Sequence, residues 1–305
     1  MSDVVILGIF VADLAFEAPR LPVMGETILG QGFRMGPGGK GSNQAVAAAK
    51  AGAGVTFLTR LGDDQFGEIA LKTWGEVGID TSFVVRDGER PTGAAFIFIS
   101  TETRDNAIIV ESGAAGALSP ADVDAAQAAI EGARVFVTQL EQPIEAARRG
   151  LEIARGAGVA TLFNPAPAVP LPDGFLALCD TVTPNESEAE AITGVKVRSL
   201  DEARSAADRL RQMGAGAAII TLGEKGALYH DGTVSELVPA FKAGPVRDTT
   251  GAGDAFNGGF ATALSQGRAP LDAVRFACAT ASLSVTRLGT APAMPSRQEI
   301  DALLG

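Results

Sequence analysis

Short apolar runs alternate along most of the chain with alanine-rich stretches that have helical periodicity. Serine-led helix starts, each with an acidic residue three positions later, stand at Ser119, Ser199 and Ser296. Strand and helix alternating in this way predict an α/β fold whose mainly parallel sheet is covered on both faces. The apolar runs that predict buried strands are residues 4–10, 55–61, 135–139, 159–163 and 217–222.

Two segments, residues 12–33 and 91–110, interrupt this rhythm because they lack helical periodicity. They contain short β-like pieces at residues 27–29, 93–100 and 107–110. Strands outside the alternating pattern predict a small separate sheet that serves as a lid over an active site. We therefore expect one domain over residues 1–305, with a lid sub-domain from about residues 12–36 and 91–111. A half-exposed lid sheet would also offer a surface for dimerisation.

Composition and charge narrow the class of protein. The chain has 305 residues, and its 46% hydrophobic and 20% charged content is that of a globular protein. The net charge of −11 argues against a nucleic-acid surface. No basic stretch precedes the first apolar run, and no apolar run is long enough to span a membrane. Cys179 and Cys278 lie far apart, in no metal-binding spacing, so we expect a cytoplasmic protein without disulfides.

The chain has a single histidine, His230, next to an Asp231-Gly232 pair that indicates a tight hairpin turn. We expect an exposed turn residue there. Without a second histidine, neither a Ser-His-Asp triad nor a multi-histidine metal site can form. Acid–base chemistry must therefore fall to carboxylates or lysines.

A glycine-rich stretch, residues 36–44, precedes a helical run and contains Lys40 and Asn43. Glycines let the backbone approach a ligand closely, and the helix start adds a favourable dipole. It is not a Walker A loop, since Gly41 stands where Ser or Thr is required. The stretch favours a site for a polar ligand, although a tight loop before a helix would look the same.

A second motif, Gly251-Ala252-Gly253-Asp254, opens an apolar helix. The small residues would leave backbone N–H groups free for a phosphate or its transition state. A carboxylate repels an anion unless it accepts a proton from a group that attacks the anion, which makes Asp254 a candidate base. The alternative is that Asp254 meets the helix dipole. Phe256 occupies the sixth position, so the dinucleotide fingerprint is not met.

Two further motifs are compatible with a nucleotide. Asn185 and Glu188 begin an acidic helix, where they could organise a hydrated Mg²⁺, although acidic first turns are common for dipole reasons alone. Thr221-Leu222-Gly223-Glu224-Lys225-Gly226 follows a predicted strand, and loops at this end of parallel strands bind ligands.

These four motifs, in this order, resemble the PfkB carbohydrate kinase family and, within it, the ribokinases. Residues 38–47 look like the first family signature and residues 248–254 like the second. The similar segments between them are residues 139–141, 164–167, 183–186 and 221–223. The resemblance covers essentially the whole chain and implies a ribokinase-like three-layer α/β/α core with a Rossmann-like sheet and a β lid. It also implies a homodimer through the lid and transfer of the ATP γ-phosphate to a sugar's primary hydroxyl, D-ribose giving ribose 5-phosphate.

The resemblance also implies residue roles. Asp254 falls on the general base, and the anion-hole positions are Gly251, Ala252 and Gly253. The sugar-contacting positions are Asp13, Gly39, Lys40, Asn43, Glu141 and Asp254. The nucleotide-contacting positions are Asn185, Thr221, Gly223, Glu224, Gly226, Ala252, Gly253 and Cys278. Glu188, with Asn185, matches the motif linked to Mg²⁺. The positions that match a monovalent cation site, usually for K⁺, are Asp248, Thr250, Ser284, Arg287 and Gly289.

Three positions depart from the ribokinase pattern. Val11 stands where ribokinases carry an Asn that binds a ribose hydroxyl, so 2-deoxyribose or another furanose competes with ribose as the expected substrate. Cys278 replaces a polar residue near the adenine, and Ala293 replaces a Ser near the cation.

Two rival functions stay open. The first is a related kinase for a nucleoside or a keto-sugar phosphate, whose extra phosphate the lid-region arginines Arg34, Arg90 and Arg104 would meet. The second is a sugar or nucleotide sensor without catalysis on the same fold.

Overall fold

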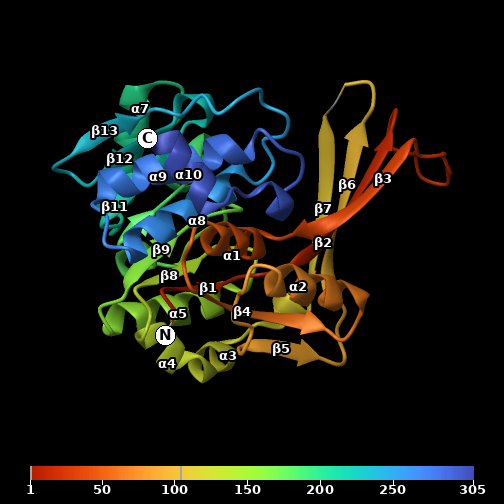
Figure 1. Ribbon diagram of the computed structural model, residues 1–305, viewed down its shortest axis with the longest axis horizontal. Coiled ribbons are helices and arrows are strands. Elements are labelled where there is room, and N and C mark those ends of the chain that lie inside the picture. Colours follow the sequence, from red (N-terminus) through yellow and green to blue (C-terminus); the bar gives the residue numbers. More distant parts are fainter. Residues whose placement is uncertain (1, 104) are drawn as a thin grey trace.

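The computed structural model describes residues 2–103 and 105–305, so Arg104 lies outside the described residues. Its larger sheet has nine strands in the order β13-β12-β11-β10-β9-β8-β1-β4-β5 (Figure 1). The strands are β1 (Val4–Leu7), β4 (Val55–Gly62), β5 (Val84–Asp87), β8 (Val135–Thr138), β9 (Ala160–Phe163), β10 (Thr181–Val182), β11 (Ala217–Thr221), β12 (Ala227–His230) and β13 (Ser235–Val238). All neighbours pair in parallel except β11–β12 and β12–β13. The mainly parallel sheet is thus confirmed.

Helices cover both faces of this sheet because its inner strands, such as β1, are apolar on both. Val4 and Ile6 of β1 pack into one hydrophobic cluster, and Val5 and Leu7 into the other. The first face carries α1 (Lys40–Lys50), α2 (Gln65–Gly75), α8 (Ala252–Ser265), α9 (Pro270–Ser284) and α10 (Arg297–Leu304). The second carries α3 (Pro120–Ala125), α4 (Gln127–Glu131), α5 (Ile144–Gly156), α6 (Glu186–Thr193) and α7 (Leu200–Gln212). The expected three-layer α/β/α core is confirmed. Among the helices described, none has the length and apolarity to cross a membrane.

All five predicted buried strands are present, each with ends that differ by a few residues from the prediction. Ser119 and Ser296 close capping boxes at the starts of α3 and α10, as expected. Ser199 caps α7 by accepting from the N–H of Glu202, but the carboxylate of Glu202 accepts from Arg198 instead of closing the box.

A second sheet of four strands, in the order β3-β2-β6-β7, projects from one side of the core (Figure 1). Its strands are β2 (Val11–Ala18), β3 (Gly32–Gly38), β6 (Thr92–Ser100) and β7 (Asn106–Gly113). The pieces predicted at residues 93–100 and 107–110 belong to β6 and β7. The prediction of a strand at residues 27–29 is wrong. Pairing with β2 begins only at Gln31, whose N–H donates to the carbonyl oxygen of Glu17.

One face of this four-stranded sheet is apolar and exposed. Phe16 stacks against Phe33 and Phe96, with ring centroids 4.9 and 5.8 Å apart, and all three rings remain more than a third exposed. Met35 and Ile109 extend the patch. We call these five side chains the apolar lid face. Such a face is unusual on a surface that stays in contact with water.

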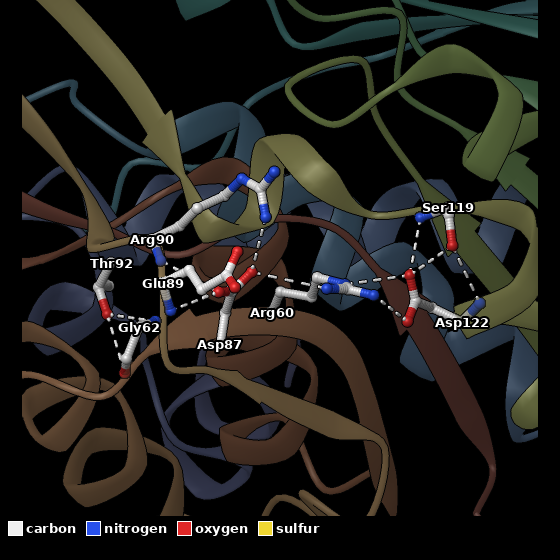
Figure 2. A network of polar contacts seen from close by, with 8 residues as sticks. All are labelled: Arg60, Gly62, Asp87, Glu89, Arg90, Thr92, Ser119 and Asp122. Atoms are coloured by element: carbon white, nitrogen blue, oxygen red, sulfur yellow. Dashed lines mark hydrogen bonds and ion pairs between the residues drawn. The ribbon is translucent and has the colours of Figure 1, made fainter.

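The base of the four-stranded sheet is tied to the core by an ion-pair network (Figure 2). Arg60 of β4 donates to both carboxylate oxygens of Asp122 at 3.1 and 2.8 Å and lies 3.6 Å from Asp87. The hydroxyl of Thr92, where β6 begins, accepts from the N–H of Gly62 at 2.9 Å. We call Arg60, Asp87 and Asp122 the lid-base network.

The hairpin predicted at Asp231-Gly232 joins β12 to β13. The expectation that His230 is an exposed turn residue is wrong. His230 is the last residue of β12 and only 8% exposed, and its Nε2 lies 2.8 Å from a carboxylate oxygen of Asp208 on α7. The histidine thus joins a helix to the edge of the sheet.

Candidate active site

A cavity of about 160 Å³ lies at the carboxyl ends of the parallel strands, where the predicted motifs meet. It is lined by Lys40, Asn164, Ala166, Thr183, Asn185, Glu188, Thr221, Thr249, Gly251, Ala252, Gly253, Asp254 and Asn257. Residues from all four predicted motifs are therefore brought to one place by the fold, although more than 200 residues of chain separate the first motif from the second.

The start of α8 is shaped for close approach. Gly251 is the N-cap residue and has a left-handed backbone with φ of 77°, which favours glycine. The N–H of Ala252 donates to the carbonyl oxygen of Thr249 at 3.2 Å, so this amide is already engaged in the turn. Gly253 and Asp254 occupy the following first-turn positions, whose N–H groups have no acceptor within the helix. Two of these backbone donors are therefore available to an anion.

The carboxylate of Asp254 is buried and held between two side-chain amides. Asn43 donates to Oδ2 at 3.0 Å and Gln44 donates to Oδ1 at 3.2 Å. Burial raises the pKa of Asp254, while the charge of Lys40 and the two hydrogen bonds act in the opposite direction. A raised pKa brings a carboxylate closer to the range in which it can accept and release protons.

Lys40 lies among several carboxylates. Burial lowers its pKa, but the negative charges of Asp254, Glu141 and Glu188 outweigh burial and raise it. The backbone N–H of Lys40 donates to Glu141 at 2.7 Å. Burial raises the pKa of Glu141 to about 7 and, with a smaller contribution from Asp254, that of Asp13 to about 6. The site thus gathers more carboxylates than its single lysine can neutralise.

The backbone beside this group requires glycine. Gly39 has φ of 87°, and a Cβ there would lie 2.6 Å from the carbonyl oxygen of Ile9. A Cβ on Gly38 would lie 2.2 Å from the carboxylate of Asp13. The glycines of the first motif therefore bring the start of α1 against the link between β1 and β2.

Asn185 and Glu188 form a capping box at the start of α6. The side chain of Asn185 accepts from the N–H of Glu188, and the carboxylate of Glu188 accepts from the N–H of Asn185. The dipole explanation for these residues therefore holds in part, yet both also line the cavity. Asn185 forms a bridge with Thr221, which brings the fourth motif alongside. Gly223 and Gly226 have φ of 55° and 103° in the turn after Thr221, next to Glu224.

The positions expected for a monovalent cation lie on two adjacent loops. The carboxylate of Asp248 accepts from the N–H groups of Thr250 and Gly289, and the N–H of Arg287 donates to the carbonyl oxygen of Ser284. The guanidinium of Arg287 pairs with Glu299. Ala293 is buried nearby in the chain, in a short 3₁₀ turn.

Cys278 is not among the residues that line the cavity, and its nucleotide contact stays a prediction. Its side chain is 4% exposed, and its thiol lies 3.8 Å from the carbonyl oxygen of Val238 in the hydrophobic core of α9. Burial raises the pKa of this thiol to about 12, which makes it unreactive.

Sequence reasoning missed four buried polar residues at the site: Gln44, Asn164, Thr183 and Asn257. Gln44 follows Asn43 directly in the first motif, and Asn164 and Thr183 lie where β9 and β10 end. An uncharged polar residue directly after an apolar strand was the available signal for the last two.

Comparison with known proteins agrees with this geometry. The model of the pfkB family carbohydrate kinases matches residues 1–297, and the chain belongs to this family. It is a ribokinase-like phosphotransferase.

Individual relatives cover almost the whole chain. A ribokinase from Haemophilus influenzae is 39% identical over 294 residues, which are 96% of this chain and 95% of the relative. A deoxyribokinase from Salmonella typhi is 37% identical over 303 residues, 99% of this chain and 98% of the relative. A solved structure of Arabidopsis thaliana ribokinase complexed with ribose and ATP has a TM-score of 0.93 and 30% identity, covering 99% of this chain and 98% of that one.

Proposed function

We propose that this kinase transfers the γ-phosphate of ATP to the primary hydroxyl of a pentose, with D-ribose giving ribose 5-phosphate. The observation that carries the proposal is the buried carboxylate of Asp254, held by two amides one residue after Gly253 at the start of a helix. The relative from Arabidopsis thaliana was solved with ribose and ATP, which supports the same pair of substrates here.

The chemistry follows from this arrangement. The sugar oxygen attacks the γ-phosphorus as the bond to the β-phosphate oxygen breaks, and the hydroxyl proton passes to Asp254. The N–H groups at the start of α8 and the ammonium of Lys40 offset the negative charge of the transferring group. Asn43 carries a buried oxygen without a hydrogen-bond partner among the described residues, which a sugar hydroxyl would satisfy. A general base of this kind contributes about 10²–10⁴ in rate.

The chain's donors fit the two cations that the proposal includes. Glu188 offers a carboxylate oxygen to a hydrated Mg²⁺ beside Asn185, and Mg²⁺ needs few protein ligands because it keeps its waters. Among the described residues no group of three or more His, Cys, Asp or Glu side chains is placed to hold a metal ion. The proposed K⁺ site lies at the loops of Asp248 and Gly289, which a hydrogen bond joins. When bound, Mg²⁺ neutralises phosphate charge.

The test of the catalytic assignment is Asp254→Asn, which keeps the shape of the side chain but removes the base. We expect normal folding and a loss of at least about 10²-fold in turnover. ADP release that depends on added sugar is the measurement, with circular dichroism as the folding control. Sugar-dependent turnover close to that of the unsubstituted enzyme would refute the role of Asp254.

The identity of the sugar is the second part of the proposal, and 2-deoxy-D-ribose is the second candidate after D-ribose. The side chain of Val11 is a hydrocarbon, so it offers no hydrogen bond to a sugar hydroxyl, and it is only 3% exposed. A buried ribose hydroxyl left without a partner would cost about 1–3 kcal/mol. The relatives include both ribokinases and a deoxyribokinase at similar identity.

Comparing kcat/KM for the two sugars decides between them. If Val11 favours the deoxy sugar, Val11→Asn raises the ratio of ribose to 2-deoxyribose turnover about tenfold or more. A strong preference for ribose in the unsubstituted enzyme, unchanged by Val11→Asn, would contradict the deoxyribose candidate. Other furanoses and nucleosides belong in the same screen.

We also propose that the four-stranded sheet acts as the lid sub-domain of one kinase domain and as the contact between two copies. The apolar lid face supports a homodimer, since isolated monomers rarely expose stacked phenylalanines. The proposed location is the cytoplasm. Sedimentation equilibrium of the protein and of Phe16→Ser tests the dimer, which the substitution should weaken.

A further inference from the structure

Behind the carboxylate of Asp254 lies a chain of three buried side-chain amides and one threonine that carries no assigned role. Gln44 of α1, Gln139 after β8, Asn164 after β9 and Thr183 after β10 are each at most 6% exposed. We call these four residues the amide relay. Buried polar groups of this number are unusual in the centre of a domain unless they are joined by hydrogen bonds and serve the site.

The orientation of each amide in the relay, with its donor and acceptor atoms, follows from a backbone carbonyl at one end. The backbone carbonyl of Thr183 can only accept a hydrogen bond, so Asn164 must present its Nδ2 there, at 3.0 Å. The Oδ1 of Asn164 then faces Gln44 and accepts from Nε2 at 3.1 Å. The nitrogen and oxygen of the Gln44 amide therefore cannot exchange places, because the Gln44 oxygen would then face the oxygen of Asn164.

The same nitrogen of Gln44 has a second hydrogen, which is directed to Oδ1 of Asp254 at 3.2 Å. The side-chain oxygen of Gln44 accepts a hydrogen bond from Nε2 of Gln139 at 2.6 Å. Both hydrogens and the oxygen of the Gln44 amide are thus used. This arrangement favours a carboxylate at Asp254, because a hydrogen bond to an ionised oxygen is stronger than one to a protonated carboxyl group.

Thr183 joins the relay to the helix start as well. Its hydroxyl donates to Oδ1 of Asn257 at 2.6 Å, and Nδ2 of Asn257 donates to the carbonyl oxygen of Gly253 at 2.9 Å. One residue at the end of β10 therefore positions both the carboxylate of Asp254 and the backbone beside it.

We propose that Gln44 is a positioning residue for Asp254, and that Asn164 and Thr183 fix the orientation in which Gln44 acts. The inference rests on the proposed role of Asp254 as general base. Gln44 holds the carboxylate in place from behind, and it is not among the residues that line the cavity.

The test compares Gln44→Met with Gln142→Met. Both exchanges remove a buried glutamine amide, but Gln142 bonds to Thr138 and to the backbone carbonyl oxygen of Gln139, and among the described residues it makes no hydrogen bond to Asp254 or to the side chains of the relay. For Gln44→Met we expect kcat to fall about 10- to 100-fold, as for one hydrogen bond to a charged group, with KM for ATP and sugar within about threefold. D-Ribose is the sugar used, or 2-deoxy-D-ribose if ribose is not turned over.

The pH profile separates positioning from a general loss of structure. The loss of one donor raises the pKa of Asp254, so the acid limb of kcat/KM moves to higher pH in Gln44→Met. Lys40 on α1, Asp13 on β2, Glu141 after β8 and Glu188 on α6 also face Asp254, and all remain in the variant. Gln142→Met should leave the limb in place.

Gln44→Glu is the second variant, for use if Gln44→Met does not fold. It keeps the shape and the oxygen facing Gln139 but sets an acidic group against Asp254, so the acid limb should move further than in Gln44→Met. An unmoved limb in the folded Gln44 variants, or an equal loss of kcat in Gln142→Met, overturns the inference. Asp254→Asn, assayed in parallel, reports separately on the base: if it stays active, the proposed function fails and not merely the relay.

Discussion

The carboxylates of the active site and those at the base of the lid differ in how well they are paired. At the active site, burial raises the pKa values of Asp13, Glu141 and Asp254, with one lysine among them. At the lid base, backbone N–H groups lower the pKa of Asp87. Burial raises that of Asp122, but Arg60 and Ser119 outweigh it, so the pKa is lowered (Figure 2).

The contrast shows that ionised carboxylates stabilise the fold at the lid base and destabilise it at the active site. Paired carboxylates hold the strands that lead into and out of the four-stranded sheet, and their negative charge favours the folded state. At the active site burial outweighs the hydrogen bonds and the charge of Lys40, so ionisation of Asp13, Glu141 and Asp254 opposes folding. Three substitutions test this difference, from the largest expected effect on stability to the smallest.

Glu141→Gln should show the largest effect. The pKa of Glu141 rises from 4.5 to about 7 on folding, so the folded state binds its proton more tightly than the unfolded state does. Its contribution to stability is therefore full below pH 4.5 and is lost as pH rises toward 7. Relative to the unsubstituted protein, the variant should gain about 3 kcal/mol in free energy of unfolding between pH 4 and pH 8.

Urea unfolding without ligands at several pH values measures this gain. The control is Glu145→Gln, the same exchange at an exposed site on α5 a few residues away, which removes a carboxylate that is not buried. A Glu141→Gln curve parallel to that of the unsubstituted protein would show that burial at the active site does not oppose folding.

Arg60→Met should destabilise the protein by about 1–3 kcal/mol near neutral pH, because the carboxylate of Asp122 loses two hydrogen bonds from a charged partner. The pKa of Asp122 is lowered in the fold, so its contribution is present above its unfolded pKa of 3.8 and the loss should shrink only as the pH falls below that value. Thermal unfolding at pH 7 and at a pH well below 3.8 measures this. Arg148→Met removes an exposed i,i+4 pair with Glu152 and is the matched control. Equal effects of Arg60→Met and Arg148→Met would show that the lid-base network stabilises the fold no more than an ordinary helix pair.

Arg20→Gln should have no measurable effect on the melting temperature. Hydrogen bonds from Arg20 lower the pKa of Glu26 to about 2, a larger shift than at many buried sites. Both side chains nevertheless lie in solvent on the loop between β2 and β3, where water replaces the lost partner. Titration of Glu26 by NMR should show its pKa rise in the variant. A fall of several degrees in the melting temperature would mean that pairing, and not burial, decides what a carboxylate contributes.

Much of the core was predictable because it depends on local patterns. Apolar runs marked the buried strands, and serine caps marked helix starts at Ser119 and Ser296. The motifs also indicated Lys40, Asn43, Asn185 and Glu188 near Asp254, since parallel strands end at one edge of the sheet.

The remainder depends on partners that are distant in the sequence. His230 reads as a turn residue until the carboxylate of Asp208 on α7 is placed beside it. Gln44 is one polar residue among many until Gln139 and Asn164, which lie 95 and 120 positions further along, meet it in the core. Residues 27–29 have a strand-like composition but no neighbouring strand to pair with, which local pattern cannot report.

The packing of α1 against α8 has a consequence for how the chain folds. Asn43 and Asp254 touch across 211 positions, so during synthesis the amino-terminal helix emerges long before its partner exists. Contacts of such sequence separation slow folding and leave apolar surface uncovered in the interval. The nascent chain should therefore stay without activity, and depend on chaperones, until nearly all of it has left the ribosome.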